Sequence, residues 1–264
     1  MTQLIIGAAC GYPTTDLEPF VKSLRRYYQG DAVLVVFPLS DSDRTFFEQY
    51  NIITYELDQS IPNPKDIQTY RYYFYNECME NFPTADHVLI IDVRDVMFQD
   101  DPFKYPLTHQ LEFYQEPCLY KNCPANAPWM HGIYSQSGYD LVKDEYILCS
   151  GSTIGTFQGM SLYINAMIKE IERIQATGRH IHSGEDQPIH NFLVYNQTFP
   201  DSITHPNAEH AIATLHHQHQ FTFNRAGQLL NSRNEPIPIV HQWDRTNAVK
   251  AVAERTALEG PLKY

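Results

Sequence analysis

A short apolar run that ends in two closely spaced acids constrains this chain more than any other feature. Residues 88–91 read Val-Leu-Ile-Ile, and an unbroken run of branched apolar residues is typical of a strand covered on both faces. Asp92 and Asp95 follow at the carboxyl end of this strand, where open α/β sheets form their ligand crevices. Two carboxylates there repel each other and are costly to desolvate, so a bound cation would explain both. Oxygen ligands suit Mg²⁺ or Mn²⁺, which usually bring phosphate oxygens with them, and the sequence therefore predicts a metal–diphosphate site.

Apolar patterns before this run predict alternating strands and helices. Strands are expected at residues 4–9, 32–37 and 52–57. Between them we expect one helix capped by Asp16 and a second capped by Ser40 or Asp41. This β-α-β-α-β order predicts parallel strands joined by right-handed crossovers.

A further helix, over residues 66–81, leads into the strand that ends at Asp92. The apolar stripe expected on this helix consists of Ile67, Tyr70, Phe74 and Cys78. Arg71 lies one position off that stripe. Residues 1–103 are therefore interpreted as the nucleotide-binding half of the chain.

The region that follows is less regular. Residues 117–139 read as a loop rich in Pro, Asn and Gly, and residues 146–149 read as a brief strand. The small residues at positions 150–153 then read as a loop that lets a ligand approach the backbone closely. Residues 104–264 are interpreted as the second half of the same domain.

Two helices and a hairpin are expected nearer the carboxyl end. A strongly periodic stretch at residues 160–177 predicts a helix that Gly178 ends, and another helix begins near Asp186. A hairpin is expected after residue 205. Because the chain shows no internal repeat, we expect one α/β domain over residues 1–264, with a mostly parallel central sheet flanked by helices.

Charge and cysteine content bound the class of protein. A formal net charge of −12 argues against nucleic acid as a partner, because phosphate backbones require clustered Lys and Arg. The five cysteines are scattered, which is typical of reduced thiols in an intracellular protein. The apolar start of the chain lacks a basic leader and is too short for a signal peptide or a transmembrane segment. We therefore expect a soluble, cytoplasmic protein.

Four segments carry a resemblance to a known family. They are DVRDVMFQDDPF at 92–103, CSGSTIGT at 149–156, EDQPIHN at 185–191 and VHQWDR at 240–245. In this order they resemble the GT-A family of nucleotide-sugar-dependent glycosyltransferases. The first segment is most similar to a branch with plant, algal-virus and microbial members, which carries a D-V-R-D-V-x-F-Q-x-D-P-F block. The resemblance implies a Rossmann-like GT-A fold, in which residues 104–264 hold the donor sugar and the acceptor.

In this family the acidic motif binds a divalent metal, usually Mn²⁺, together with the ribose and diphosphate of the donor. The usual D-x-D pattern is one residue longer here, which leaves Arg94 open as an insertion, a phosphate contact or an outward-facing residue. Aligned from the end of the motif, Asp95 is the better metal ligand, and Asp92 lies nearer the ribose or holds a metal-bound water. His241 matches a late-loop histidine that binds the same metal.

Other positions match the base-binding loop after the first strand, a basic residue on the helix before the acidic motif, and residues beside the donor sugar. The donor-binding residues implied by the resemblance are Ala8, Cys10, Gly11, Tyr12, Arg71, Asp92, Val93, Arg94, Ser150, Gly151 and Gln187. Asp186 matches an acid that contacts the sugar near its reacting carbon, and it is the catalytic candidate.

The resemblance implies transfer of a sugar from a nucleotide-diphosphate donor, a UDP-sugar, to a glycan or other hydroxyl acceptor. The metal would neutralise charge that develops on the departing diphosphate. Asp186 could be the base of an inverting reaction or a sugar-orienting group, and the sequence leaves both open. One alternative is a sugar nucleotidyltransferase, although GAACGYPTTD at residues 7–16 lacks the Gly-rich basic loop of that class. Another is an inactive carbohydrate-binding homologue, against which the retention of Asp95 and His241 argues.

The two key residues outside the acidic motif, Asp186 and His241, also have a purely structural interpretation. Asp186 could cap the helix that begins at Pro188, and His241 could be a buried histidine bonded to the backbone. The histidines at positions 216, 217 and 219 are interpreted as surface or strand residues, because adjacent side chains point in different directions.

Overall fold

The computed structural model describes residues 1–58, 66–218, 220–247 and 250. The strands of this part are β1 (Gln3–Ala8), β2 (Asp31–Val36), β3 (Ile53–Glu56), β4 (His87–Asp92), β5 (Val96–Phe98), β6 (Leu111–Leu119), β7 (Tyr146–Thr156), β8 (Ser202–His205), β9 (Ile212–Thr214) and β10 (Ile239–His241). The helices are α1 (Thr14–Tyr27), α2 (Asp41–Gln49), α3 (Ile67–Glu80), α4 (Asn126–Val142), α5 (Phe157–Gln175) and α6 (Asp186–Tyr195), with short 3₁₀ helices η2 (Tyr120–Asn122) and η3 (Trp243–Arg245).

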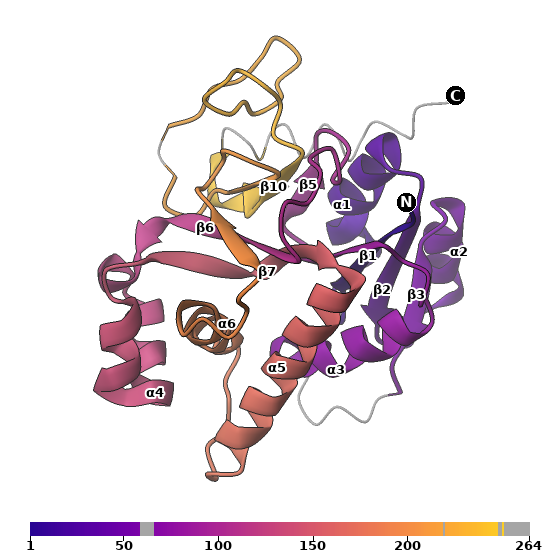
Figure 1. Ribbon diagram of the computed structural model, residues 1–264. Coiled ribbons are helices and arrows are strands. Elements are labelled where there is room, and N and C mark those ends of the chain that lie inside the picture. The colour runs from indigo at the N-terminus through magenta and orange to yellow at the C-terminus, as the bar shows by residue number, and fades with distance from the viewer. Residues whose placement is uncertain (59–65, 219, 248–249, 251–264) are drawn as a thin grey trace.

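The strands form one large and one small sheet (Figure 1). The large sheet has the order β3-β2-β1-β4-β7-β6-β8, and the small sheet has the order β5-β10-β9. Neighbouring strands from β3 to β4 pair in parallel, as do β6 and β8, whereas β7 is antiparallel to both of its neighbours. The expected β-α-β-α-β unit and mostly parallel α/β sheet are confirmed. The β4–β7 pairing also carries the sheet across position 103, so both halves share one sheet.

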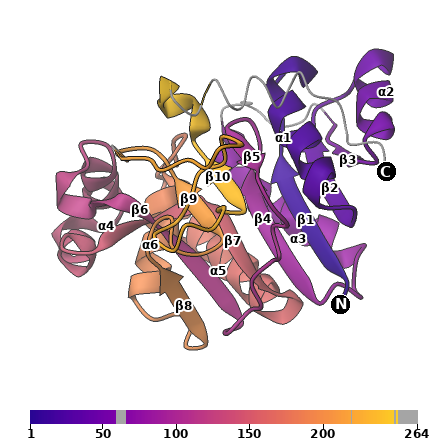
Figure 2. The ribbon, with the colours of Figure 1, turned by 90° about the horizontal axis from the view of Figure 1, so that it is seen from above.

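Helices cover the two faces of the large sheet unequally (Figures 1 and 2). One face packs against α3, α4, α5 and α6 through a core that includes Tyr72, Met130, Tyr163 and Ile189. The other face packs against α1, α2 and the small sheet. Because both faces are covered, β4 is apolar from Val88 to Ile91, and these residues are at most 2% exposed.

Capping differs between the first two helices. Ser40 caps α2 in a capping box with Asp43, as one of the two expected alternatives. The prediction that Asp16 caps α1 is wrong, because the helix begins at Thr14 after Pro13. The fixed φ of Pro13 suits a helix start, and Asp16 lies in the first turn, where its charge favours the positive end of the helix dipole.

The stripe predicted for α3 is also wrong in part. Ile67, Tyr70 and Phe74 are only partly buried. The buried side instead carries Thr69, Arg71, Tyr72, Tyr75, Cys78 and Met79. A buried arginine escapes an analysis based on apolar spacing, because its burial depends on carboxylates that other segments supply.

Residues 117–139 are not a loop. They complete β6, form η2 and continue into α4, in which Ser135 breaks the helical backbone with a φ of 59°. Gly138 lies so close to Tyr134 that an added Cβ would be 2.1 Å from that side chain. Gly138 therefore allows the side chain of Tyr134 to pack against the backbone of α4 next to the kink.

The strand expected at residues 146–149 continues for 11 residues as β7, so Ser150 to Thr153 lie inside a strand instead of a loop. Small residues along β7 reflect crowding by neighbouring segments, as at Gly155, where an added Cβ would lie 2.7 Å from the carbonyl oxygen of Gln110.

The carboxyl-terminal region matches the expectations more closely. α5 is followed by Gly178 with a φ of +82°, as expected for a helix stop. Antiparallel bridges join Phe223 to Leu229 and Leu230 to Pro236, which confirms a hairpin beyond residue 205. Within the described residues, every helix is too short or too polar to cross a membrane.

Candidate metal centre and active site

Three side chains from two segments far apart in the sequence meet at the carboxyl end of β4. Asp92 is the last residue of β4, and His241 is the last residue of β10. The antiparallel register of β10 with β5 places His241 opposite Val96, beside Asp95. The Nε2 atom of His241 lies 3.4 Å from Oδ2 of Asp92 and 3.6 Å from Oδ1 of Asp95. The sheet therefore brings together the three residues that the sequence pointed to as metal ligands.

The donor set fits a divalent cation. Asp95 and His241 are 8% and 1% exposed, and Nε2 of His241 has no hydrogen-bond partner in the described part of the chain. A buried nitrogen that faces two carboxylates without a hydrogen bond leaves room for a shared ion. One imidazole with two carboxylates suits Mn²⁺.

Charge compensation at this cluster comes from basic neighbours. Burial opposes ionisation of Asp92, but Arg71 and His241 outweigh this effect and hold its pKa below the usual range. Burial likewise disfavours ionised Asp95, but the nearby imidazole of His241 outweighs this effect and lowers the pKa of Asp95. Burial lowers the pKa of His241, but Cys149 and the two carboxylates more than reverse this and raise it. The two aspartates are thus ionised, as metal ligands must be.

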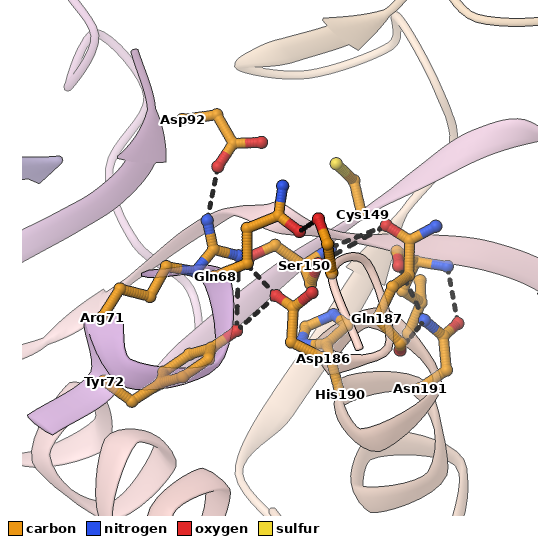
Figure 3. Close-up of polar contacts among 12 residues, drawn as sticks. Gln68, Arg71, Tyr72, Asp92, Cys149, Ser150, Asp186, Gln187, His190 and Asn191 are labelled. Carbon is orange, nitrogen blue, oxygen red and sulfur yellow. Dashed lines mark hydrogen bonds and ion pairs between the residues drawn. The ribbon is translucent and has the colours of Figure 1, made fainter. Parts of the chain in front are cut away.

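Arg71 connects the cluster to Asp186 (Figure 3). Its Nη1 atom pairs with Asp92, and its Nη2 atom donates to Oδ2 of Asp186 at 2.7 Å and to the carbonyl oxygen of Ser150 at 3.1 Å. The hydroxyl of Tyr72 also donates to Oδ2 of Asp186, at 3.2 Å. Burial lowers the pKa of Arg71, but Tyr72 and the two carboxylates raise it well above its usual value, so the guanidinium is charged.

The role of Asp186 as a helix cap is contradicted. Glu185 holds the N-cap position of α6 and makes no side-chain cap, and Asp186 turns its carboxylate toward Arg71. Asp186 is 3% exposed, and its burial raises its pKa even though Arg71 acts in the opposite direction. A carboxylate in this position orders the site instead of the helix.

Gly151 leaves the space that the Asp92 carboxylate fills. A Cβ at this position would lie 2.2 Å from Oδ2 of Asp92. The β4–β7 register pairs Ile91 with Ser152, which sets Gly151 beside Asp92. The glycine predicted to approach a ligand therefore approaches a candidate metal ligand.

A cavity of about 350 Å³ opens beside the cluster, within the size range of small-molecule sites. Its wall includes ten of the residues singled out from the sequence: Ala8, Tyr12, Arg71, Asp92, Val93, Arg94, Asp95, Ser150, Asp186 and Gln187. His241 and Gly151 lie behind this wall, in contact with Asp92.

No protein-family model and no curated protein matches the chain. Its chemistry therefore has to follow from the side chains of the site.

Besides Gly151, two residues expected to bind the donor lie outside the cavity wall. Cys10 is buried, its thiol lies 3.5 Å from the carbonyl oxygen of Val35, and burial raises its pKa to about 12. Gly11 has a φ of +81°, so it shapes the turn after β1. These residues hold the loop that presents Tyr12, whose ring is 41% exposed.

Arg94 is folded back against the protein. Its guanidinium donates to Asp244 at 2.9 Å and lies 3.4 Å from Asp95. Of the three possibilities left by the sequence, an outward-facing residue is the poorest description, because Arg94 lines the cavity.

Several residues of the cavity wall escaped the analysis of the sequence. Glu116 on β6 is 3% exposed, and burial raises its pKa to about 7. Trp129 and Asn126 come from α4, the helix that was mistaken for a loop. Their only signal was the unexplained clustering of Trp, Asn and Pro in that stretch.

His216 and Arg245 also line the cavity. The ring of His216 stacks on that of His217 with centroids 3.9 Å apart, so adjacent histidines here do not point in different directions. Arg245 lies 3.7 Å from Asp95, and its side chain is 47% exposed. Its place at the end of VHQWDR, beside His241, was the signal that could have marked it.

Proposed function

We propose that the protein is a metal-dependent glycosyltransferase of the GT-A type, which transfers a sugar from a UDP-sugar to a hydroxyl group of a glycan or similar acceptor. One observation carries the proposal: two ionised aspartates and a buried histidine meet at the carboxyl edge of parallel strands, against a cavity lined by arginines. Such an edge is where open α/β sheets bind ligands. The order of the four resembling segments supports the same conclusion.

Asp92, Asp95 and His241 would hold the cation, which when bound supplies Lewis-acid neutralisation of the departing diphosphate. Around it, Arg245 is well placed to contact phosphate oxygens, because its half-exposed guanidinium borders the cavity next to Asp95. Arg94 adds a second positive charge to the same wall. The exposed ring of Tyr12 offers an apolar face on which a base can stack.

The contacts of Asp186 favour an orienting role over that of a base. Its Oδ2 atom already accepts hydrogen bonds from Arg71 and Tyr72, and the side chain is almost wholly buried. An acceptor hydroxyl could transfer its proton to this oxygen only by competing with Arg71, a buried and charged hydrogen-bond donor. Asp186 would therefore fix Arg71 and the sugar-binding wall instead of moving a proton.

Glu116 is the cavity carboxyl group best suited to accept a proton. A pKa of about 7 leaves it part ionised near neutral pH, which is the favourable range for a general base. Asp92 and Asp95 are committed to the cation, and Asp186 to Arg71. We therefore assign proton acceptance from the acceptor hydroxyl to Glu116 in this proposal.

A thermal-shift experiment tests the proposal. Stabilisation by UDP that requires Mn²⁺ is expected for the wild type and is expected to vanish in Asp95→Ala, because mass action stabilises only the state that binds. Asp140→Ala removes an exposed acid on α4 and serves as the matched control. Full Mn²⁺-dependent UDP binding by Asp95→Ala would contradict the assignment.

A donor-hydrolysis screen with UDP-, GDP- and dTDP-sugars in the presence of Mn²⁺ then identifies the donor. Release of nucleoside diphosphate from one donor supports the transferase. Stabilisation by free sugar alone would instead indicate a carbohydrate-binding protein, and formation of a nucleotide-sugar from a nucleoside triphosphate and a sugar phosphate would indicate a nucleotidyltransferase.

A further inference from the structure

A second group of metal-ligating side chains lies at the β8 edge of the large sheet and shares no residue with the cavity wall. It consists of Glu112 on β6, His205 at the end of β8 and His210 just before β9. Figure 2 shows the ribbons of β6, β8 and β9. Glu112 is 1% exposed, whereas the side chains of His205 and His210 are 13% and 19% exposed. A buried carboxylate is therefore faced by two imidazoles that solvent can still reach.

The nitrogen atoms of both histidines converge on one oxygen atom. Nε2 of His205 lies 3.0 Å from Oε2 of Glu112, and Nδ1 of His210 lies 3.8 Å from the same oxygen. Ligand atoms that are 2.0–2.1 Å from a tetrahedral Zn²⁺ are about 3.4 Å apart. The two nitrogen–oxygen separations bracket this value, so they are close to the distance between two ligand atoms of a tetrahedral zinc site.

A hydrogen bond between Glu112 and one histidine explains only half of this arrangement. The contact between Nε2 of His205 and Oε2 of Glu112 does not require His210. The ring of His210 nevertheless lies parallel to that of His205, with centroids 4.0 Å apart and an interplanar angle of 2°. A second imidazole so close to the first and to the carboxylate is not needed for that hydrogen bond, whereas two imidazoles with one carboxylate form a common zinc ligand set.

The surroundings hold all three ligands in place. Oε1 of Glu112 accepts hydrogen bonds from the backbone nitrogen and the hydroxyl of Thr108, at 2.9 and 3.2 Å. Oε2 faces the two histidines and also accepts a hydrogen bond from the hydroxyl of Tyr114, at 3.4 Å. The ring of Tyr105 packs on His210 and that of Tyr114 packs on His205. Second-shell contacts of this kind orient the ligands of metal sites in proteins.

We propose that Glu112, His205 and His210 form a second metal site that prefers Zn²⁺. Two imidazoles and one carboxylate favour zinc over the oxygen-seeking Mg²⁺ and Mn²⁺, and the solvent-facing side leaves the fourth position for water. The bound ion ties the connection between β8 and β9 to β6. The two sites therefore differ in the metal that they select, and the second does not depend on the proposed transferase activity.

Zinc titration of the metal-free protein in competition with a chromophoric chelator tests this site. The full chain with Asp95→Ala is the background, because this substitution disables the first cluster and leaves the second intact. One equivalent of Zn²⁺ is expected to bind, and Co²⁺ is expected to give the intense visible absorption of tetrahedral coordination. Failure to bind a stoichiometric ion would overturn the proposal.

Three variants locate the ion. In the same background, His210→Gln and His205→Gln are each expected to weaken Zn²⁺ binding by at least about tenfold, the loss seen when even an outer-shell partner is removed. Glu112→Gln keeps the shape of the buried side chain and gives an independent test should a histidine variant fold poorly. His131→Gln, an exposed histidine on α4, is the control. Unchanged Zn²⁺ affinity in His210→Gln and Glu112→Gln would show that the cluster is only a histidine–glutamate ion pair.

Discussion

The guanidinium of Arg71 donates to the carboxylate of Asp186 at 2.7 Å, and both side chains are almost completely buried. The same guanidinium pairs with Asp92, so one arginine joins the candidate metal cluster to the start of α6. This contact spans 115 residues of sequence and makes the stability of the fold depend on residues of the site.

Arg71→Met is expected to destabilise the protein by about 3–5 kcal/mol, because breaking a buried ion pair leaves an uncompensated charge. The free energy of unfolding in urea measures this loss. Arg71→Met combined with Asp186→Leu is expected to recover part of it, since no buried charge is then left at Asp186. A double variant that is as unstable as the sum of both single changes would argue against direct coupling of the pair.

Gly151→Ala is expected to disable the metal cluster while the fold is kept. The added methyl group would lie 2.2 Å from the Asp92 carboxylate, which would have to leave its place opposite His241. A displacement of about 1 Å in a catalytic group can cost roughly 100-fold in rate, and a loss of this size in turnover is expected.

Gly132→Ala is the matched control, because a Cβ there meets only the flexible end of the Arg179 side chain. Circular dichroism and Mn²⁺ titration of both variants separate folding from metal binding. Mn²⁺ affinity in Gly151→Ala equal to that of the control would show that Asp92 does not need this space.

The regular part of the fold could be predicted from the sequence because it follows from burial. Apolar runs at β1, β2 and β4 mark strands covered on both faces, and the alternation with helices dictates their parallel pairing. Ser40 as a helix cap and Gly178 as a helix stop depend only on the local backbone, and both predictions are confirmed. Within the site, the acids after β4 and His241 belong to recognisable strings, and the structure brings them together.

What could not be predicted depends on partners distant in the sequence. Arg71 is buried because it forms ion pairs with Asp92 and Asp186, and the spacing of apolar residues carries no information about such contacts. Glu116 lies between Gln115 and Pro117 and belongs to no recognisable motif, so its place in the cavity becomes visible only once α4 and α6 are in place. Glycines and prolines suggested a loop at 117–139, yet they permit a kinked helix and close packing.

Cys149→Ala is expected to weaken Mn²⁺ binding by about 10- to 100-fold, the usual effect of losing a second-shell partner. The Sγ atom of Cys149 lies 3.4 Å from Nδ1 of His241, so it fixes which way the imidazole presents Nε2 to the aspartates. Cys118→Ala removes a thiol that instead faces the carbonyl oxygen of Leu119, and it serves as the control. Isothermal titration of both variants with Mn²⁺ makes the comparison, and equal affinities would remove Cys149 from the metal centre.

Glu116→Gln is expected to make the protein more stable and less active. Burial raises the pKa of Glu116 to about 7 in the folded state, above the value near 4.3 expected for an unfolded chain. At pH values above the unfolded-state pKa, the carboxyl group ionises more readily in the unfolded chain than in the folded protein. Its contribution to the free energy of unfolding therefore becomes more unfavourable as the pH rises toward 7. The stability advantage of Glu116→Gln over the wild type is therefore expected to grow by roughly 2–3 kcal/mol between pH 5 and pH 8.

Urea unfolding at the two pH values measures this difference, with the variant at pH 5 as its own reference. If Glu116 accepts the proton of the acceptor hydroxyl, glutamine at this position also lowers kcat by about 10²- to 10⁴-fold and leaves Mn²⁺-dependent UDP binding intact. A gain in stability with unchanged kcat would mean that Glu116 is a buried acid without a part in proton transfer. A stability advantage that does not change with pH would mean that its carboxyl group titrates as in the unfolded chain.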